Sequence, residues 1–226
     1  MERILVTGAY GQIGSELVPA LRDRFGVDNV IAAGYKNPVP PQFFDGPNTD
    51  VDVADYSQLD SAIMDHQVDT VYHLGSVLSA LAERDRKQAY AVNFSGVHNV
   101  LEAALANGVR QVIVPSSIAA FGPETPAHNT PNDTVQKPNT IYGISKVFTE
   151  LMGNYYTTKL GLDVRGVRLP GIISWKVEPT AGTTDYAVAI FYGAIREGRY
   201  ASFLGPDTRL PMMYMPDAVS SLIDVA

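Results

Sequence analysis

The chain has 226 residues, of which 46% are hydrophobic and 18% are charged, and its formal net charge is −7. This composition predicts a globular protein of one domain, or of one domain and part of another. Acidic charge without a basic block argues against nucleic acid or an anionic membrane as a partner. No apolar run approaches the ~20 residues of a membrane-spanning helix, and no signal peptide is expected. The lack of cysteine excludes disulfides and thiolate metal sites and fits a reducing cytoplasm; no metal site is predicted.

The first segment predicts a dinucleotide-binding unit. Residues 3–7 form a short β-branched run typical of a buried strand, and residues 15–24 have the apolar spacing of a helix. Between them lies Gly8-Ala9-Tyr10-Gly11-Gln12-Ile13-Gly14. In this context a GxxGxxG turn lets backbone N–H groups approach a pyrophosphate at a helix N-terminus. The alternative is a tight turn between strand and helix that binds no ligand.

The second predicted strand, residues 29–33, lacks an acidic residue at its end. Such a residue often holds the adenosine ribose hydroxyls. Here Gly34-Tyr35-Lys36 follows, which leaves NADP open beside NAD. Lys36 either meets a 2′-phosphate or is simply solvated. The loop that follows, rich in proline and glycine, is predicted to contain a short edge strand at Phe43-Phe44.

Two further segments could contact ligands. Asp52 and Val53 could line an adenine, or Asp52 could only shape the turn before a helix that begins at Asp55 or Ser57 and runs to about residue 66. Residues 69–74 predict a buried strand in which His73 packs rather than reacts. The strand ends at Gly75-Ser76, and Ser79 beyond it could touch a substrate, because ligands collect at the carboxyl ends of parallel strands.

The middle of the chain predicts a long helix over residues 82–107, ended by Gly108. Asn93 is polar within its apolar pattern, which indicates a buried amide with a partner. The next strand, residues 110–115, ends in Ser116-Ser117. No GxSxG motif surrounds these serines, so a serine hydrolase is disfavoured, but a serine here could donate a hydrogen bond to a reacting oxygen.

Tyr142 and Lys146 follow a long loop at 121–139 and belong to a helix predicted to run to about residue 159, where Gly161 ends it. Their spacing places both side chains on one face of the helix. An ammonium near a phenol favours the phenolate, and such a tyrosine can take a proton from an alcohol. The alternative is an ordinary amphipathic pair.

The last part of the chain predicts a strand at 162–168, a hydroxyl-rich loop at 179–185, a helix at 185–196, a strand at 210–215 and a helix that opens at Pro216. The start of the 185–196 helix suits a carboxylate or a phosphate. Capping by Thr183 or Thr184 is the plainer interpretation, and it is compatible with a bound ligand.

Together these motifs resemble the extended short-chain dehydrogenase/reductase family. The segments 115–123, 161–165, 170–174, 181–188 and 210–215 closely resemble the L-threonine 3-dehydrogenases of that family. The resemblance implies an α/β Rossmann-type doubly wound parallel sheet over residues 1–170 and a small C-terminal substrate-binding lobe over 171–226, in which the chain ends early. It also implies NAD-dependent oxidation of L-threonine to 2-amino-3-oxobutyrate, by a homodimer that pairs the helices of Asn93 and Tyr142.

The same resemblance assigns roles by position. Tyr142 would be the base on the C3 hydroxyl, Lys146 would tune it and hold the nicotinamide ribose, Ser117 would donate to the reacting oxygen, and Asn93 would support a proton-relay water. The residues implied in cofactor binding are Gly8, Gly11, Gln12, Ile13, Gly14, Asp52, Val53, Leu74, Gly75, Ser116, Tyr142, Lys146 and Pro170. Those implied in substrate binding are Ser79, Ser117, Tyr142, Gly182, Thr183 and Thr184.

The chain departs from the family pattern at two positions of the cofactor site. Tyr10 replaces a small residue or a cysteine and is expected to crowd the turn or its neighbour. Gly34 replaces the aspartate that binds the ribose. Two alternatives therefore stay open: a nucleotide-sugar epimerase or dehydratase of the same superfamily, and a catalytically inactive dinucleotide-binding protein.

Overall fold

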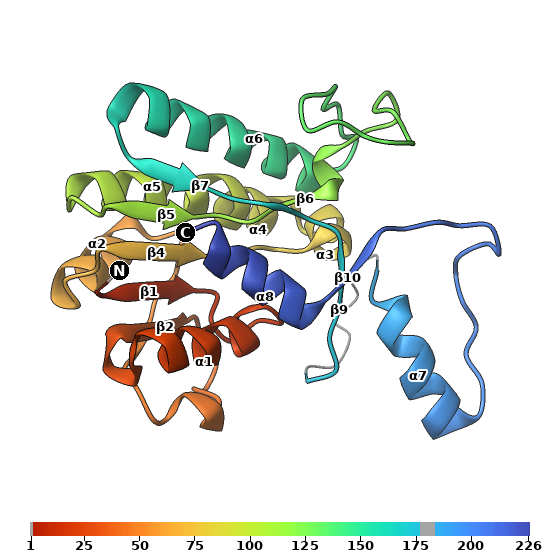
Figure 1. The fold of residues 1–226 in the computed structure, drawn as a ribbon, viewed down its shortest axis with the longest axis horizontal. Coiled ribbons are helices and arrows are strands. Elements are labelled where there is room, and N and C mark those ends of the chain that lie inside the picture. The colour runs from red at the N-terminus through yellow and green to blue at the C-terminus, as the bar shows by residue number, and fades with distance from the viewer. Residues whose placement is uncertain (1, 177–183) are drawn as a thin grey trace.

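A parallel six-stranded sheet forms the centre of the computed structural model, which describes residues 2–176 and 184–226 (Figure 1). The strand order is β3-β2-β1-β4-β5-β7. The strands are β1 (Ile4–Thr7), β2 (Val30–Gly34), β3 (Asn48–Asp50), β4 (Thr70–His73), β5 (Gln111–Ile113) and β7 (Asp163–Arg165). Strands β2 and β3 are added on one side of β1 and the later strands on its other side, beginning with β4. This order is that of a doubly wound Rossmann sheet, so the predicted fold class is confirmed.

Helices cover both faces of the sheet. Ile4 and Val6 of β1 pack towards α1 (Gly14–Phe25) and α8 (Met215–Asp224), whereas Leu5 packs towards the other face. That other face is covered by α2 (Tyr56–Asp65), α5 (Gly96–Ala106) and α6 (Ile141–Tyr155). Alternate strand residues point to opposite faces, so a strand covered on both sides is apolar throughout, as β1 is. Burial of each such side chain stabilises the fold by about 1.5–3 kcal/mol.

Local signals set the helix boundaries that the sequence predicts. Asp55 caps α2 by accepting hydrogen bonds from the amides of Ser57 (2.9 Å) and Gln58 (3.4 Å). Thr140 caps α6 in the same way through the amide of Gly143, at 3.0 Å. Gly161, with φ of +79°, ends the helical segment after α6 in the left-handed conformation that glycine tolerates. The predicted helix start at Asp55 and the predicted end at Gly161 are confirmed.

The single long helix predicted over residues 82–107 is wrong. The segment consists of α3 (Ser79–Arg84), α4 (Arg86–Tyr90), a π-helical turn at Ala91–Ser95, and α5. Asp85 breaks the helix because its carboxylate accepts a hydrogen bond from the amide of Gln88, at 2.9 Å, and so caps α4. Aspartate side chains compete with the helical backbone in this way. The apolar periodicity of the segment did not reveal the break.

The edge strand predicted at Phe43-Phe44 is also wrong. Residues Pro41–Phe43 form a 3₁₀ turn, and the edge strand is β3, further along the chain. Phe43 is apolar because its side chain is fully buried in the core, not because it belongs to a strand. The strand predicted at 162–168 is divided into β7 and β8 (Arg168–Leu169), and β8 pairs with β6 (Ser116–Ser117).

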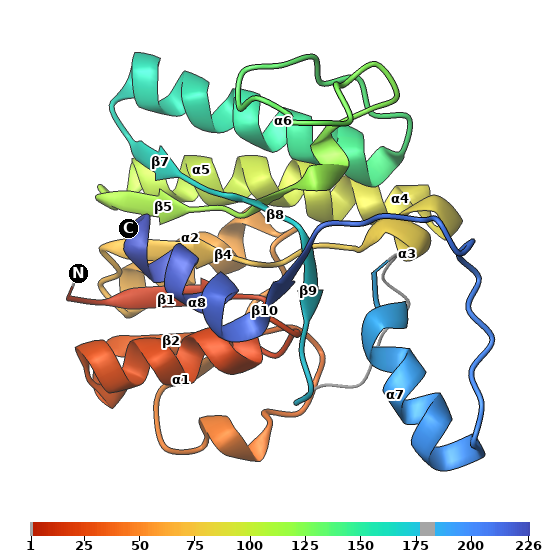
Figure 2. The same ribbon diagram turned by 45° about the vertical axis from the view of Figure 1, so that its right-hand side comes forward.

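The last part of the chain contributes to the core and also extends away from it. A parallel pair of strands, β9 (Gly171–Ile173) and β10 (Met212–Tyr214), precedes α8, which packs on α1. Helix α7 (Tyr186–Glu197) lies apart from the sheet in both views (Figure 1, Figure 2). β10 confirms the strand predicted at 210–215, and β9 was not predicted. Within the described residues, none of the helices combines the length and apolar character that crossing a bilayer requires.

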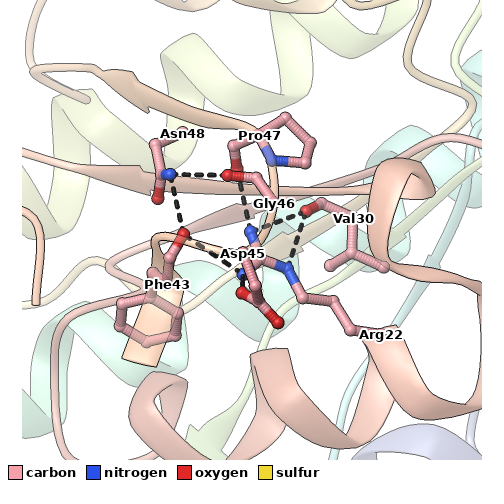
Figure 3. A network of polar contacts seen from close by, with 7 residues as sticks. All are labelled: Arg22, Val30, Phe43, Asp45, Gly46, Pro47 and Asn48. Carbon is pink, nitrogen blue, oxygen red and sulfur yellow. Dashed lines mark hydrogen bonds and ion pairs between the residues drawn. The ribbon is translucent and has the colours of Figure 1, made fainter. Parts of the chain in front are cut away.

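A buried arginine fastens the loop between β2 and β3 to helix α1 (Figure 3). The guanidinium of Arg22, whose side chain is 4% exposed, donates to the carbonyl oxygens of Val30 (3.3 Å) and Pro47 (2.9 Å). It also donates to the carbonyl oxygen of Phe43 at 3.4 Å and pairs with the carboxylate of Asp45 at 2.7 Å. Because buried charge is costly unless it is paired and hydrogen-bonded, these contacts fix the course of the loop.

Replacement of this arginine should destabilise the fold. Arg22→Met is expected to lower the free energy of unfolding by about 3 kcal/mol, because it leaves the carbonyl oxygens of Val30 and Pro47 without their buried donor. Urea denaturation measures the loss. The matched control is Arg24→Met on the exposed side of the same helix, which should change stability by no more than about 0.5 kcal/mol. Equal losses for the two variants would contradict the role given to Arg22.

Candidate active site

A cleft of about 390 Å³ lies at the carboxyl ends of the central strands. It is lined by the turn after β1, the segment after β4, the ends of β6 and β8, and the first turns of α6. The predicted site residues that line it are Gly8, Gly11, Gln12, Ile13, Gly14, Leu74, Ser79, Ser116, Ser117, Tyr142, Lys146, Pro170 and Thr184. The structure thus brings together residues predicted for the cofactor, for catalysis and for the substrate. Asp52, Val53, Gly75 and Asn93 are not among the lining residues, and Gly182 and Thr183 lie outside the described residues.

The glycines of the first turn are required by close packing. Gly8 has φ of +69°, and a Cβ atom there would lie 2.7 Å from the backbone nitrogen of Gly75. A Cβ atom on Gly14 would overlap the carbonyl oxygen of Ala9. A Cβ atom on Gly11 would meet only the carbonyl oxygen of Gly8, at 3.2 Å, so its other side is open. Gly11, Gln12, Ile13 and Gly14 line the cleft where α1 begins, and a helix start that faces a cleft in this way fits the pyrophosphate of a dinucleotide.

Tyr142 and Ser117 interact within the cleft. The hydrogen bond with Ser117 lowers the pKa of the Tyr142 phenol, but the larger effect of burial raises that pKa above its ordinary value of 10.0. The Ser117 hydroxyl oxygen also accepts a hydrogen bond from the amide of Ala119 at 3.1 Å, which orients it. The lowered phenol pKa expected from the sequence is therefore wrong for the protein alone, because removal of water from the phenolate outweighs the favourable contacts.

Lys146 lies one turn beyond Tyr142 on the same face of α6, as predicted. Its Nζ atom lies 5.4 Å from the centre of the Tyr142 ring and donates to the carbonyl oxygen of Pro115 at 3.0 Å. Burial lowers the pKa of Lys146 to about 8, and the nearby carboxylate of Glu150 acts in the opposite direction. The amine is therefore mostly protonated at neutral pH and loses its charge as the pH rises through about 8.

Glu150 is a structural partner of the site that the sequence analysis missed. Its carboxylate accepts hydrogen bonds from Arg168 through Nε (2.8 Å) and Nη2 (2.7 Å), and from the hydroxyl of Ser116 and the amide group of Gln136. These donors hold the pKa of Glu150 below its ordinary value despite burial. The available signal was its position four residues after Lys146, which places both on one helix face.

Asn93 is the buried amide with a partner that the sequence predicts. Its Nδ2 donates to the carbonyl oxygen of Val77 at 2.9 Å, and its Oδ1 accepts from the amide of Val77 at 2.7 Å and from the hydroxyl of Ser76 at 3.2 Å. The side chain thus shapes the segment after β4, where Ser76 and Leu78 line the cleft. Asn93 therefore does not line the cleft itself but holds the segment that does.

Asp52 and Val53 lie beside the cleft. The Asp52 carboxylate accepts a hydrogen bond from the amide of Ala54 at 2.9 Å, which is the turn-shaping role left open by the sequence. Val53 is buried, and its methyl groups face Gly75 and Gly96. Val53 therefore supports the segment after β4 from the α5 side.

His73 is a packed strand residue, as expected. Its Nδ1 atom lies 2.7 Å from the hydroxyl of Thr7 on the neighbouring strand. Burial, with a contribution from the charge of Lys146, lowers its pKa to about 3, so the ring is neutral at physiological pH. Its Nε2 atom is buried and has no hydrogen-bond partner among the described residues.

The start of α7 contributes Thr184 and Asp185 to the cleft. The N-cap of this helix is Asp185 rather than Thr184. Thr184 contributes to the start of α7 through its carbonyl oxygen, which accepts a hydrogen bond from the amide of Ala187 at 3.2 Å. Its side chain is therefore not explained by helix capping.

Comparison with known proteins agrees with this geometry. The NAD dependent epimerase/dehydratase family matches residues 4–222. The chain belongs to this family. It is 46% identical over 224 residues to the mitochondrial L-threonine 3-dehydrogenase of Bos taurus, a match that covers 99% of this chain and 60% of that protein. The chain thus spans about 60% of the length of such mammalian relatives.

Solved structures of threonine dehydrogenases share the fold. That of the L-threonine dehydrogenase from Clostridium difficile superposes with a TM-score of 0.95 at 46% identity, covering 99% of this chain and 70% of that one. A monomeric L-threonine 3-dehydrogenase from a metagenome superposes with a TM-score of 0.93 at 41% identity, covering 98% and 70%. The family resemblance stated from the sequence is confirmed.

The charge of Glu150 should control the titration of Lys146. Glu150→Gln is expected to lower the pKa of Lys146 below about 8, because it removes the carboxylate that stabilises the ammonium and leaves the Arg168 guanidinium uncompensated. NMR titration of the labelled lysine side chains measures the shift. Glu124→Gln, which removes an exposed carboxylate paired with Lys137, should leave it unchanged. A constant or raised pKa in the Glu150 variant would refute the coupling.

Proposed function

We propose that this protein oxidises the C3 hydroxyl of L-threonine to give 2-amino-3-oxobutyrate, with NAD as the hydride acceptor. The observation that carries the proposal is the placement of Tyr142, Ser117 and Lys146 in the same cleft as the glycine turn. The similarity to threonine dehydrogenases supports the choice of substrate.

The cofactor would lie along the carboxyl ends of the strands. The backbone of the Gly8–Gly14 turn would hold the pyrophosphate, and Lys146 the nicotinamide ribose. Asp52 and Val53 would flank the adenine. Bound NAD supplies the acceptor for the hydride that leaves C3. The other residues assigned to its binding are Leu74, Gly75, Ser116, Tyr142 and Pro170.

The chain's own residues would handle the proton and the oxygen. Ser117 would donate a hydrogen bond to the substrate oxygen, and Tyr142 would accept the proton of the C3 hydroxyl as the C–H bond gives up its hydride. Because burial raises the phenol pKa, a positive charge would be needed to make the phenolate accessible. We assign this role to the Lys146 ammonium, whose Nζ atom lies 5.4 Å from the centre of the Tyr142 ring. We assign Asn93 the role of holding the Ser76-Val77 segment so that a proton-relay water can be placed.

The substrate would be held between the two parts of the chain. Ser79 from the first part and Thr184 from the second both line the cleft, and Gly182 and Thr183 would complete the site for the ammonium and carboxylate of the amino acid. We therefore propose residues 1–170 as the dinucleotide-binding domain and the region around β9, α7 and β10, within 171–226, as the substrate-binding lobe. Helix α8 belongs with the core by its packing.

Removal of the phenol should abolish the proton transfer. Tyr142→Phe is expected to lower the rate of threonine-dependent NADH formation by about 100-fold or more while the shape of the side chain is kept. The wild-type rate should pass through a maximum as the pH rises from neutrality. The phenolate fraction grows with pH because the Tyr142 pKa is raised, but the Lys146 ammonium that supports the phenolate is lost as the pH passes its pKa of about 8.

Three outcomes would each overturn part of this proposal. A Tyr142→Phe variant with the wild-type rate would show that another group accepts the proton. Turnover of UDP-glucose in place of L-threonine would favour a nucleotide-sugar enzyme. Dinucleotide binding without turnover of either compound would favour a catalytically inactive protein.

We also propose that the protein forms a homodimer through α4 and α6. Ile144, Leu151 and Tyr155 lie on one stripe of α6, seven and four residues apart, and are 46%, 63% and 51% exposed. Tyr90 of α4, 60% exposed, stacks on Phe94 beside the same helix. An exposed apolar stripe of this kind is typical of a protein–protein contact.

A charge on this stripe should separate the subunits. Leu151→Glu is expected to shift sedimentation from dimer to monomer, because the contact would bury the new carboxylate. Phe44→Glu, at an equally exposed apolar side chain on the loop before β3, should not change it. A wild-type chain that sediments as a monomer would refute the dimer.

A further inference from the structure

Tyr10 and Gly34, the two departures from the family pattern, lie against each other. A Cβ atom added to Gly34 would overlap the ring of Tyr10, with the nearest contacts all made by ring atoms. Gly34 is the last residue of β2, and Tyr10 lies in the glycine turn that follows β1. The aromatic ring therefore fills the space in which an acidic side chain at the end of β2 would begin.

The Tyr10 ring is supported by an aromatic contact. Tyr10 stacks on Phe43, with ring centres 5.3 Å apart and the planes inclined by 29°. Phe43 is fully buried, and the guanidinium of Arg22 lies 5.9 Å from its ring centre and binds its carbonyl oxygen. Movement of the half-buried Tyr10 ring away from Gly34 would therefore cost its stacking contact with Phe43.

Tyr10 and Gly34 do not line the cleft but lie beside it, next to the glycine turn. We infer that they are a specificity-determining pair for the adenosine ribose, and that the protein binds NAD and NADP with similar affinity. A carboxylate at the end of β2 would accept hydrogen bonds from the ribose hydroxyls of NAD and would repel the 2′-phosphate of NADP. With an aromatic ring in its place, both effects are absent. The inference rests on the proposed dinucleotide cofactor.

The remaining charges at this end are mixed. Asp50 of β3 is the register partner of Gly34, and its Oδ1 atom accepts a hydrogen bond from the Lys36 amide at 3.1 Å. The ammonium of Lys36 lies 4.5 Å from the ring centre of Tyr35. Asp50 is thus the neighbouring acid that could substitute for the missing one, and it has to be tested separately.

Binding measurements test the inference without depending on turnover. Titration calorimetry of the purified protein with NAD and with NADP should give dissociation constants within about tenfold of each other, because one charged hydrogen bond and one repulsion are missing. A preference clearly above about tenfold for either dinucleotide would overturn the inference. Binding of neither would overturn it together with the cofactor assignment.

Paired variants test the contact itself. The double variant Tyr10→Ala/Gly34→Asp should prefer NAD by at least about tenfold more than the wild type, because the carboxylate now has room. Gly34→Asp alone should bind both dinucleotides more weakly, because the new side chain must displace the ring. Tyr10→Ala alone should keep the wild-type ratio and shows whether loss of the ring is tolerated by the fold.

Two controls distinguish occlusion by Tyr10 from ribose binding by Asp50. If Gly34→Asp alone gained the same NAD preference as the double variant, Tyr10 would not be occluding the position, and the inference would fail. Asp50→Asn should leave the ratio unchanged, and a change would assign the ribose to Asp50 instead.

Failure of the inference can be distinguished from failure of the proposed function by measuring cofactor binding and threonine turnover separately. Similar affinities for the two dinucleotides in a protein that does not oxidise threonine would leave the inference standing and refute the proposed substrate. Threonine oxidation by a protein that binds NAD but not NADP would support the proposed function and refute the inference.

Discussion

The cleft depends on one close approach of backbone to backbone, between Gly8 and Gly75. The two residues follow adjacent parallel strands, β1 and β4, and a Cβ atom on Gly8 would come within 2.7 Å of the Gly75 nitrogen. This contact lets the turn after β1 lie directly against the segment after β4. That segment is held on its far side by Asn93, whose amide binds Val77 in two directions. The glycine turn and helix α6 can therefore face one cavity.

Desolvation then sets the chemistry of the cavity. The same burial raises the pKa of Tyr142 and lowers that of Lys146, because each charged form loses water. A positive charge near the phenol must therefore be supported by the protein, and the supports are the Pro115 carbonyl oxygen and the Glu150 carboxylate. Since Glu150 is itself fixed by Arg168, the electrostatics of the site depend on a side chain that does not line the cleft.

Local sequence patterns predicted the parts of this structure that local physics controls. The buried run of β1, the Asp55 cap and the spacing of Tyr142 and Lys146 each depend on residues close in sequence, and each was found. The break at Asp85, the 3₁₀ turn before Phe44 and the role of Glu150 depend on side chains that compete with the backbone or meet distant partners. Serine and arginine partners of Glu150 lie 34 and 18 residues away, and no periodicity reports such contacts. Tyr10 was expected to crowd its turn or its neighbour. The residue it meets is Gly34, at the end of the adjacent strand β2.

The Tyr10–Gly34 contact also shows why these two departures have to be interpreted together. A glycine at the end of β2 opposite a small residue would leave a gap beside Phe43, and voids in a packed interior destabilise a fold. A tyrosine in the turn opposite an acidic residue would create the overlap that the geometry shows. Each substitution is therefore unfavourable alone and compatible with the other, which is the condition under which effects at two contacting sites are not additive. Taken singly, Gly34 suggests a damaged cofactor site; taken with Tyr10, it belongs to a site that is packed in a different way.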